Sequence, residues 1–229
     1  MDLQKIKLIQ NASLDELKDN IFLEDLIKKL GFNTEFLREQ PNIVKENGGG
    51  LLIWQYPNQF SKYLTLLQKQ TISSYIEIGC RWGGTFVLTT EYLKRFNDIT
   101  KSIAVDIINS PVSEYCNNDT TFFKKMDSQD SYFKNDNKIK DNHFDLIFID
   151  GDHSYEGVKN DYEIFKDSGN IFVFNDIIND TFSAGVVKFW HELKQSNDFD
   201  FYEFIEQYDD VWNHTSQRFL GIGVAIKKN

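Results

Sequence analysis

The sequence predicts an α/β fold built on a doubly wound, mostly parallel sheet. From about residue 72 onward, short apolar runs alternate with segments of helical length, which is the pattern of βαβ units. Two runs, LIFI (146–149) and IFVF (171–174), are continuously apolar, as in strands that helices cover on both faces. A glycine-rich turn follows the first run, and acidic residues follow several others. In such a sheet, ligands bind beyond the carboxyl ends of the strands.

The expected elements follow from these patterns. The segments with strand character are 74–78, 102–107, 144–149, 170–174 and 219–226, the last as an antiparallel addition. The segments with helix character are 13–30, 34–39, 59–68, 84–95, 155–165 and 183–195. Ser13 and Glu16 form a capping box at the start of the first helix, and Gly31 stops it. The run 47–50, Asn-Gly-Gly-Gly, predicts a flexible break. Residues 1–70 are expected to form a helical extension or cap, and residues 71–229 the ligand-binding domain.

Composition and charge narrow the class of protein. A chain of 229 residues is long enough for one α/β domain with a small extension. The formal net charge of −10 argues against broad, non-specific binding to nucleic acid, which requires Lys and Arg to neutralise phosphates. No apolar run approaches the ~20 residues of a membrane helix, and the N-terminus lacks the apolar core of a secretory signal. We therefore expect a cytoplasmic protein, with Cys80 and Cys116 as reduced thiols.

The first motif with chemical content is Glu77-Ile78-Gly79-Cys80-Arg81-Trp82-Gly83-Gly84-Thr85. It joins a strand to a helix, with Gly79 allowing a sharp turn and Gly83 a close approach of backbone to ligand. Its spacing differs from the dinucleotide fingerprint G-x-G-x-x-G, because position 81 is Arg. An ordinary tight turn between strand and helix remains the alternative.

A second acid stands at the end of the next strand. Asp106 lies 29 residues after Glu77, where a carboxylate can accept hydrogen bonds from both hydroxyls of a ribose. A solvated carboxylate at a strand end is the plainer interpretation. The glycine-rich loop and Asp106 together favour the ligand-binding one.

The stretch Asp150-Gly151-Asp152-His153 is the most informative. Two carboxylates and an imidazole lie within four residues at a strand end, and Asn175-Asp176 ends the next expected strand. Asp150 and Asp176 would then be neighbours, and adjacent like charges require a compensating cation or proton. Oxygen ligands suit Mg²⁺ or Mn²⁺, and His153 can accept a proton near neutral pH. Helix capping by Asp152 or Ser154 explains part of the pattern, but not all of it.

At these residues the chain resembles class I S-adenosylmethionine-dependent methyltransferases over roughly residues 72–229. The loop matches their E/D-x-G-x-x-x-G pattern, and FIDGDHSYEGVKNDYE (148–163) is similar to metal-dependent sugar and small-molecule O-methyltransferases of the macrolide-sugar, cephalosporin-pathway and catechol O-methyltransferase types. The resemblance implies a Rossmann-like, seven-stranded sheet with an antiparallel last strand. Segment 54–64, WQYPNQFSKYL, is similar to one that precedes the cofactor domain in bacterial and viral relatives.

The resemblance also implies the roles of individual residues. Cofactor binding falls to Glu77, Gly79, Cys80, Gly83, Thr85, Asp106, Asp127, Ser128 and Asp150, with Asp127 and Ser128 near the adenine. Asp150, Asn175 and Asp176 would bind a divalent cation. The order of the Asn-Asp pair is the reverse of that in catechol O-methyltransferase. His153, or else Asp152, takes the proton from the acceptor hydroxyl. Trp54, Tyr56 and Phe60 close over the ligands, or, for Phe60 above all, pack in the core.

Competing interpretations remain open at this level. A nicotinamide-dependent oxidoreductase predicts a G-x-G-x-x-G loop and a catalytic Tyr-Lys pair, and neither is evident. A non-catalytic protein or a hydroxylase of the same fold is also compatible with the motifs. The expected partners are a small-molecule or glycan acceptor and a second copy of the chain in a homodimer, without nucleic acid or membrane.

Overall fold

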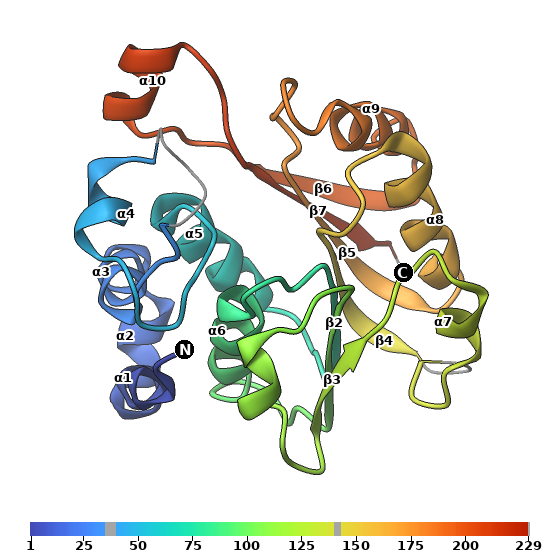
Figure 1. The fold of residues 1–229 in the computed structure, drawn as a ribbon, viewed down its shortest axis with the longest axis horizontal. Helices are drawn as coiled ribbons and strands as arrows, with labels where there is room; N and C mark the ends of the chain where they lie inside the picture. Colours follow the sequence, from blue (N-terminus) through green and yellow to red (C-terminus); the bar gives the residue numbers. More distant parts are fainter. Residues whose placement is uncertain (35–39, 140–142, 229) are drawn as a thin grey trace.

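The computed structural model describes residues 1–34, 40–139 and 143–228. At its centre lies a seven-stranded sheet of order β3-β2-β1-β4-β5-β7-β6 (Figure 1). The strands are β1 (Ser74–Ile78), β2 (Lys101–Asp106), β3 (Thr121–Lys125), β4 (Phe144–Ile149), β5 (Gly169–Asn175), β6 (Phe199–Phe204) and β7 (Ile222–Lys227). β7 pairs antiparallel with both β5 and β6, whereas the pairs among β1 to β5 are parallel. The predicted seven-stranded, doubly wound sheet with an antiparallel last strand is confirmed.

The sequence did not predict the positions of two strands, β3 and β6. β3, TFFKK, has only two strongly apolar residues and lies among polar segments. β6, FDFYEF, lies at the sheet edge, and its buried and exposed residues alternate only partly. Edge strands have only one neighbour and are less covered, so a search for continuous apolar runs overlooks them.

The helices follow the prediction most closely after residue 80. They are α1 (Ile6–Asn11), α2 (Leu14–Lys18), α3 (Asn20–Leu30), α4 (Asn42–Glu46), α5 (Pro57–Leu67), α6 (Gly84–Leu93), α7 (Ser131–Asn135), α8 (Tyr155–Phe165), α9 (Ala184–Leu193) and α10 (Asp209–Thr215). The helix expected over 13–30 is divided at Asp19, whose carboxylate caps α3 by accepting from the amides of Ile21 and Phe22. The helix expected at 34–39 lies largely outside the described residues.

Residues 47–50, where the sequence predicts a flexible break, make backbone hydrogen bonds with Phe32, just after α3. The Gly49 amide donates to the Phe32 carbonyl, and the Leu51 amide donates to the Leu30 carbonyl. A side chain on Gly50 would lie 1.9 Å from the Leu30 carbonyl oxygen. These glycines therefore allow two backbone segments to approach closely.

Helices cover both faces of the sheet. On one face, α5 and α6 pack against side chains such as Tyr75 and Phe148, and α1 to α3 add a further layer that shares the same core (Figure 1). On the other face, α7, α8 and α9 pack against side chains such as Ile76 and Ile147. Neighbouring residues of one strand thus serve opposite faces, as the period of two requires. Within the described residues, no helix has both the length and the apolar character needed to cross a membrane.

Candidate active site

A cavity of about 710 Å³ opens at the carboxyl ends of the parallel strands. Its volume lies in the range of small-molecule and cofactor sites. The described residues that line it are Leu52, Trp54, Ile78, Gly79, Cys80, Arg81, Trp82, Gly83, Gly84, Thr85, Val105, Asp106, Ile107, Ile108, Met126, Asp127, Ser128, Gln129, Asp150, Gly151, Asp152, His153, Asn175 and Asp176. The site predicted from separate strand ends is therefore one continuous space.

The glycine-rich loop forms one wall and leads into α6. Gly79 has a φ of +84°, and a side chain there would lie 2.1 Å from the Asp150 carbonyl oxygen, so only glycine fits. The α6 helix begins at Gly84, and the first amides of a helix have no partner within it. Such amides stabilise negative groups. The loop thus offers backbone donors toward the cavity.

Asp106 stands beside this loop. Its Oδ2 accepts from the Arg81 amide at 2.6 Å, and its Oδ1 accepts from the Ile108 amide at 3.0 Å. These bonds fix the carboxylate at the cavity. Each carboxylate oxygen has a second lone pair that can accept a hydrogen bond from a hydroxyl group.

Asp127 and Ser128 lie further along the same cavity. Ser128 is buried, and Gln129, which the sequence did not single out, donates to the Asp161 carboxylate at 2.9 Å. Burial raises the pKa of Asp161 to about 7, although Ser128 and Gln129 donate hydrogen bonds to it. Asp161 therefore ties the loop after β3 to α8.

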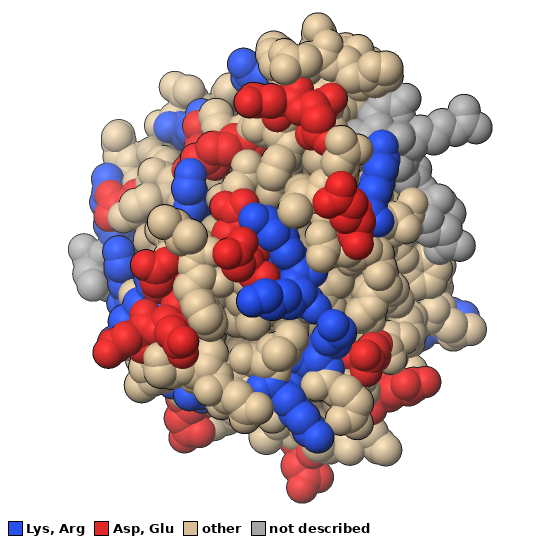
Figure 2. All heavy atoms as spheres, turned by 90° about the vertical axis from the view of Figure 1, so that its left-hand side faces the viewer, with Lys and Arg blue, Asp and Glu red and all other residues tan. Residues whose placement is uncertain are grey.

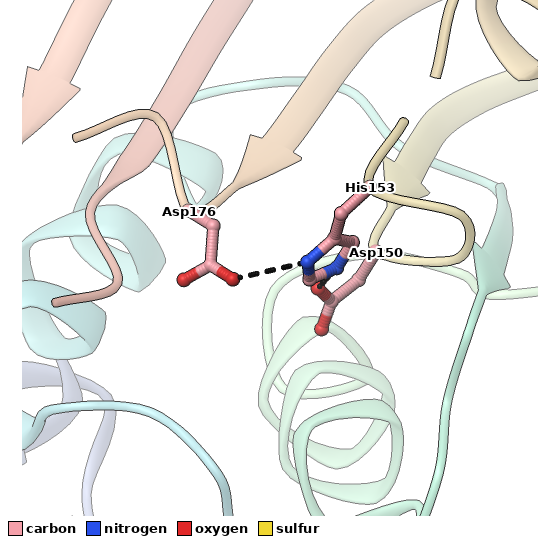
Figure 3. A group of neighbouring side chains, drawn as sticks. All are labelled: Asp150, His153 and Asp176. Carbon is pink, nitrogen blue, oxygen red and sulfur yellow. Dashed lines mark hydrogen bonds and ion pairs between the residues drawn. The ribbon is translucent and has the colours of Figure 1, made fainter. Parts of the chain in front are cut away.

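An acid–imidazole cluster occupies the other end of the cavity (Figure 3). His153 lies between two carboxylates, with Nε2 at 3.2 Å from Asp150 Oδ1 and Nδ1 at 3.3 Å from Asp176 Oδ2. Ser183 Oγ lies 2.8 Å from His153 Nδ1 and donates to Asp176 Oδ2 at 2.8 Å. The parallel register of β4 and β5 brings the two acids together from positions 26 residues apart in the chain.

Charge and burial oppose each other in this cluster. Burial by itself lowers the pKa of His153, but the hydrogen bond and charge of Asp150, with the charge of Asp176, outweigh it and raise the pKa to about 9. Burial and the nearby Asp150 charge raise the pKa of Asp176, which His153 partly offsets. The imidazole is thus the positive partner of two acids in the protein alone.

The cluster also has the donor set of a cation site. One ligand atom each of Asp150, His153 and Asp176 lies within 4.8 Å of the others. Asp176 Oδ1 is buried and has no hydrogen-bond partner among the described residues. A buried carboxylate oxygen without a partner is costly, and a hard cation is a suitable partner for it.

Three predicted site residues make contacts that the sequence did not indicate. Glu77 does not line the cavity but lies beneath the loop, where its carboxylate accepts from Tyr75 and from Thr85 Oγ1. Asp152 is exposed and accepts from the Ser154 amide, and Ser154 caps α8. Asn175 lines the cavity, but its oxygen accepts from Gln55 and its amide donates to Asp150.

A segment preceding the sheet completes the cavity wall. We call residues 51–56 the strap. Leu52 and Trp54 of the strap line the cavity, whereas Tyr56 is buried outside it and Phe60 is buried in the core. A side chain on Gly84 would lie 2.5 Å from the Leu51 carbonyl oxygen, so the strap lies directly against the start of α6. Of the aromatic residues expected to close over ligands, the structure brings only Trp54 to the cavity.

Carboxylates dominate the charge of the cavity. Among the described residues that line it are five aspartates (Asp106, Asp127, Asp150, Asp152 and Asp176), against Arg81 and His153. On the side of the molecule formed by the N-terminal helices, Lys and Arg form a narrow band flanked by Asp and Glu (Figure 2). That face is not the broad basic surface that binding to nucleic acid requires.

Part of the chain matches a known family model. Residues 76–177 match the family model described as a methyltransferase domain. This range contains the loop after β1, Asp106, and both acids of the cluster. No curated protein sequence matches the chain.

Three solved structures have the same fold. An O-methyltransferase from Bacillus cereus in complex with S-adenosylhomocysteine is 14% identical, with a TM-score of 0.52 over 94% of this chain and 92% of that one. TomG from Streptomyces achromogenes, involved in tomaymycin synthesis and complexed with S-adenosylmethionine, is 12% identical, with a TM-score of 0.51 over 81% and 85%. MycE from the mycinamycin pathway, in complex with Mg, S-adenosylhomocysteine and mycinamycin VI, is 16% identical, with a TM-score of 0.51 over 79% of this chain and 51% of that one.

Proposed function

We propose that the chain is a class I S-adenosylmethionine-dependent methyltransferase, as the match to the methyltransferase-domain model and the shared fold support, and that it methylates a hydroxyl oxygen of a sugar, a glycan or another small molecule with the help of a divalent cation. The observation that carries the proposal is the cluster of Asp150, His153 and Asp176 at one end of the cavity, with Asp176 Oδ1 unpartnered among the described residues. MycE, solved with Mg and mycinamycin VI, supports both the cation and a small-molecule acceptor.

The cofactor fits the other end of the cavity. When bound, S-adenosylmethionine supplies an activated methyl group on a positively charged sulfur. The backbone amides at the start of α6 suit its carboxylate, and Asp106 suits its ribose hydroxyls. The loop of Asp127 and Ser128 would hold the adenine. The acidic lining complements the positive sulfur.

The cation would be held by the carboxylates of Asp150 and Asp176, where it would lower the pKa of an oxygen bound beside them. Asn175 would act through Asp150, because its oxygen accepts from Gln55. His153 contacts both acids and is our proposed general base, which holds the proton taken from the acceptor. Asp152 would then stabilise the turn before α8, where it accepts from the amide of Ser154.

The residues around the reacting atoms would contribute mainly by alignment. Methyl transfer requires the acceptor oxygen to lie in line with the methyl group, and fixed orientation supplies much of the rate in such reactions. Trp54 and Trp82 offer flat apolar surfaces at the cavity. With five carboxylates in the lining, the cavity favours a neutral or cationic acceptor over an anionic one. A polyhydroxylated neutral molecule meets these conditions.

One experiment tests this function directly. The protein is incubated with methyl-labelled S-adenosylmethionine, Mg²⁺ and fractionated metabolites or glycans, and the fraction that gains the label is identified. We expect label in an ether bond of a neutral small molecule. Label in protein or nucleic acid, or on nitrogen, would contradict the proposal. Full activity after EDTA treatment would remove the cation from it.

A further inference from the structure

We propose that Gln55 of the strap is a positioning residue that acts through Asn175 to fix the carboxylate of Asp150. This inference rests on the proposed role of Asp150 in holding a cation. Gln55 Nε2 donates to Asn175 Oδ1 at 2.8 Å, and Asn175 Nδ2 donates to Asp150 Oδ1 at 2.9 Å. The three side chains form a chain of hydrogen bonds from a segment before the sheet to the reactive end of the cavity.

The direction of this chain is set by Asp150. An ionised carboxylate only accepts hydrogen bonds, so Asn175 must turn its NH₂ group toward Asp150 and its oxygen away. Gln55 must then turn its own NH₂ group toward that oxygen. Consistent with this order, Gln55 Oε1 is buried and lacks a partner among the described residues.

Burial makes the arrangement stiff. Gln55 is 2% exposed and Asn175 is 3% exposed, so water does not compete readily for their amide groups. Asp150 Oδ1 also receives a contact from His153 Nε2 at 3.2 Å. The same oxygen is therefore held from two sides, and rotation of the carboxylate would break both contacts.

The position of Gln55 in the strap gives the chain its significance. Its neighbours in the sequence include Leu52 and Trp54, which line the cavity, and the strap also packs against the start of α6. The wall of the ligand cavity and the orientation of Asp150 consequently depend on one segment. Without Gln55, Asn175 is free to turn its amide, and Asp150 loses a fixed donor.

Mn²⁺ binding measures the orientation of the acids without an acceptor. The protein is saturated with S-adenosylhomocysteine, and the free Mn²⁺ signal is followed by electron paramagnetic resonance. We expect Asn175→Ala to weaken Mn²⁺ binding about tenfold, the scale of a lost hydrogen bond to a carboxylate. Gln55→Leu should weaken it by about as much, because it releases the Asn175 amide that makes this bond. Gln59→Leu is the matched control. Gln59 is also buried and makes two hydrogen bonds, to the Glu206 carbonyl and from the Gly221 amide, and neither involves Asn175, Asp150 or Asp176.

The double variant separates positioning from general loss of stability. If Gln55 acts only through Asn175, adding Gln55→Leu to Asn175→Ala weakens Mn²⁺ binding no further. Three results would overturn the proposal. The double variant could lose affinity by the product of the two single losses, Gln55→Leu could bind Mn²⁺ as the wild type does, or Gln59→Leu could lose as much affinity as Gln55→Leu.

A second measurement covers the case in which the wild-type protein does not bind Mn²⁺, an outcome that counts against the proposed cation. The side-chain amide resonances of Asn175 are then compared by nuclear magnetic resonance in the metal-free protein. Gln55→Leu and Asp150→Asn should both shift them, and Gln59→Leu should not. If Gln55→Leu leaves the chemical shifts of the Asn175 side-chain amide unchanged, the hydrogen-bond chain is absent.

Discussion

The hydroxyl of Thr85 donates a hydrogen bond of 2.7 Å to the carboxylate of Glu77, which is only 1% exposed beneath the glycine-rich loop. Burial raises the pKa of Glu77 to about 8, although the hydrogen bonds from Tyr75 and Thr85 oppose the shift. The acid that opens the loop motif thus lies buried beneath the loop and accepts from Tyr75 and Thr85. Its protonation is linked to the stability of the fold.

This linkage predicts an unusual dependence of stability on pH. Between pH 4.5 and about 8 the unfolded chain releases the Glu77 proton and the folded protein keeps it, so this residue makes the fold less stable as pH rises. In Glu77→Gln, the amide remains neutral at every pH. We expect its free energy of unfolding in urea to fall less between pH 5.5 and 8.5 than that of the wild type, by a few kcal/mol at most (on the order of 1.4 kcal/mol per pKa unit).

Glu91→Gln is the control for this measurement. Burial raises the pKa of Glu91, but its hydrogen bonds with Tyr115 and Lys94 outweigh that effect and lower it. Its contribution is complete above pH 4.5, so this variant should lose stability equally at both pH values. An identical pH dependence in Glu77→Gln and the wild type would contradict the assignment.

Removing the carboxylate of Asp106 should weaken cofactor binding. We expect Asp106→Ala to lose roughly 1.5–3 kcal/mol in the binding of S-adenosylhomocysteine, as for hydrogen bonds to a charged group. Calorimetry measures this loss, and Asp119→Ala, at an exposed position before β3, should bind like the wild type. NAD should give no heat with either protein. Tight binding of NAD would instead favour a nicotinamide-dependent enzyme.

The contact between Gly84 and the strap predicts a steric penalty. The added methyl group of Gly84→Ala would lie 2.5 Å from the Leu51 carbonyl oxygen and 2.6 Å from the Ile53 amide, and both are backbone atoms. Overpacking of this kind costs about 1–3 kcal/mol, so Tm should fall by roughly 5 °C. In Gly48→Ala the nearest atom is the Thr34 side chain at 3.3 Å. Calorimetric scans should show a clearly smaller change in Tm for that control.

His153 should report the binding of a cation through its titration. In the metal-free protein Asp150 and Asp176 hold the pKa of His153 at about 9 against the effect of burial. A cation bound to the same acids repels the proton, so saturating Mg²⁺ should lower this pKa, and Mg²⁺ should bind more tightly as pH rises toward 9. The ring signals of His153 in a nuclear magnetic resonance titration test this, with His191 on α9 as the unaffected control. A pKa of His153 that stays the same when Mg²⁺ is added would argue against a cation on these acids.

If His153 is the base, its removal should reduce turnover more than ligand binding. With the true acceptor, His153→Ala should lose about 10²-fold or more in kcat, the lower range for general-base catalysis. The affinity for S-adenosylhomocysteine should stay close to that of the wild type. A loss below tenfold would transfer the role to another group, with Asp152 next to be tested.

We also expect a homodimer, because two-fold assembly is the commonest arrangement of small enzymes. Light scattering at working concentration should give about twice the chain mass of 26.9 kDa. A monomer mass would contradict this prediction.

Much of the fold could be predicted from local sequence. The buried strands β1, β4 and β5 are marked by apolar runs, and the turn at Gly79 and the acids after the strands mark the edge where ligands bind. Asp150 and His153 are only three residues apart, so the sequence already brings these side chains into the same neighbourhood. These features depend on neighbours within a few residues, so the sequence alone determines them.

The hydrogen-bond partners of Glu77, Asn175 and Gln55 were decided only by the tertiary structure. The phase of β1 turns Glu77 into the core, and the pairing of β4 with β5 points the amide of Asn175 at Asp150. Gln55 meets Asn175 across 120 residues of sequence. Hydrogen bonds of this kind depend on strand register and packing to within about 1 Å. A sequence lists the groups that can donate and accept, and the assembled core selects their partners.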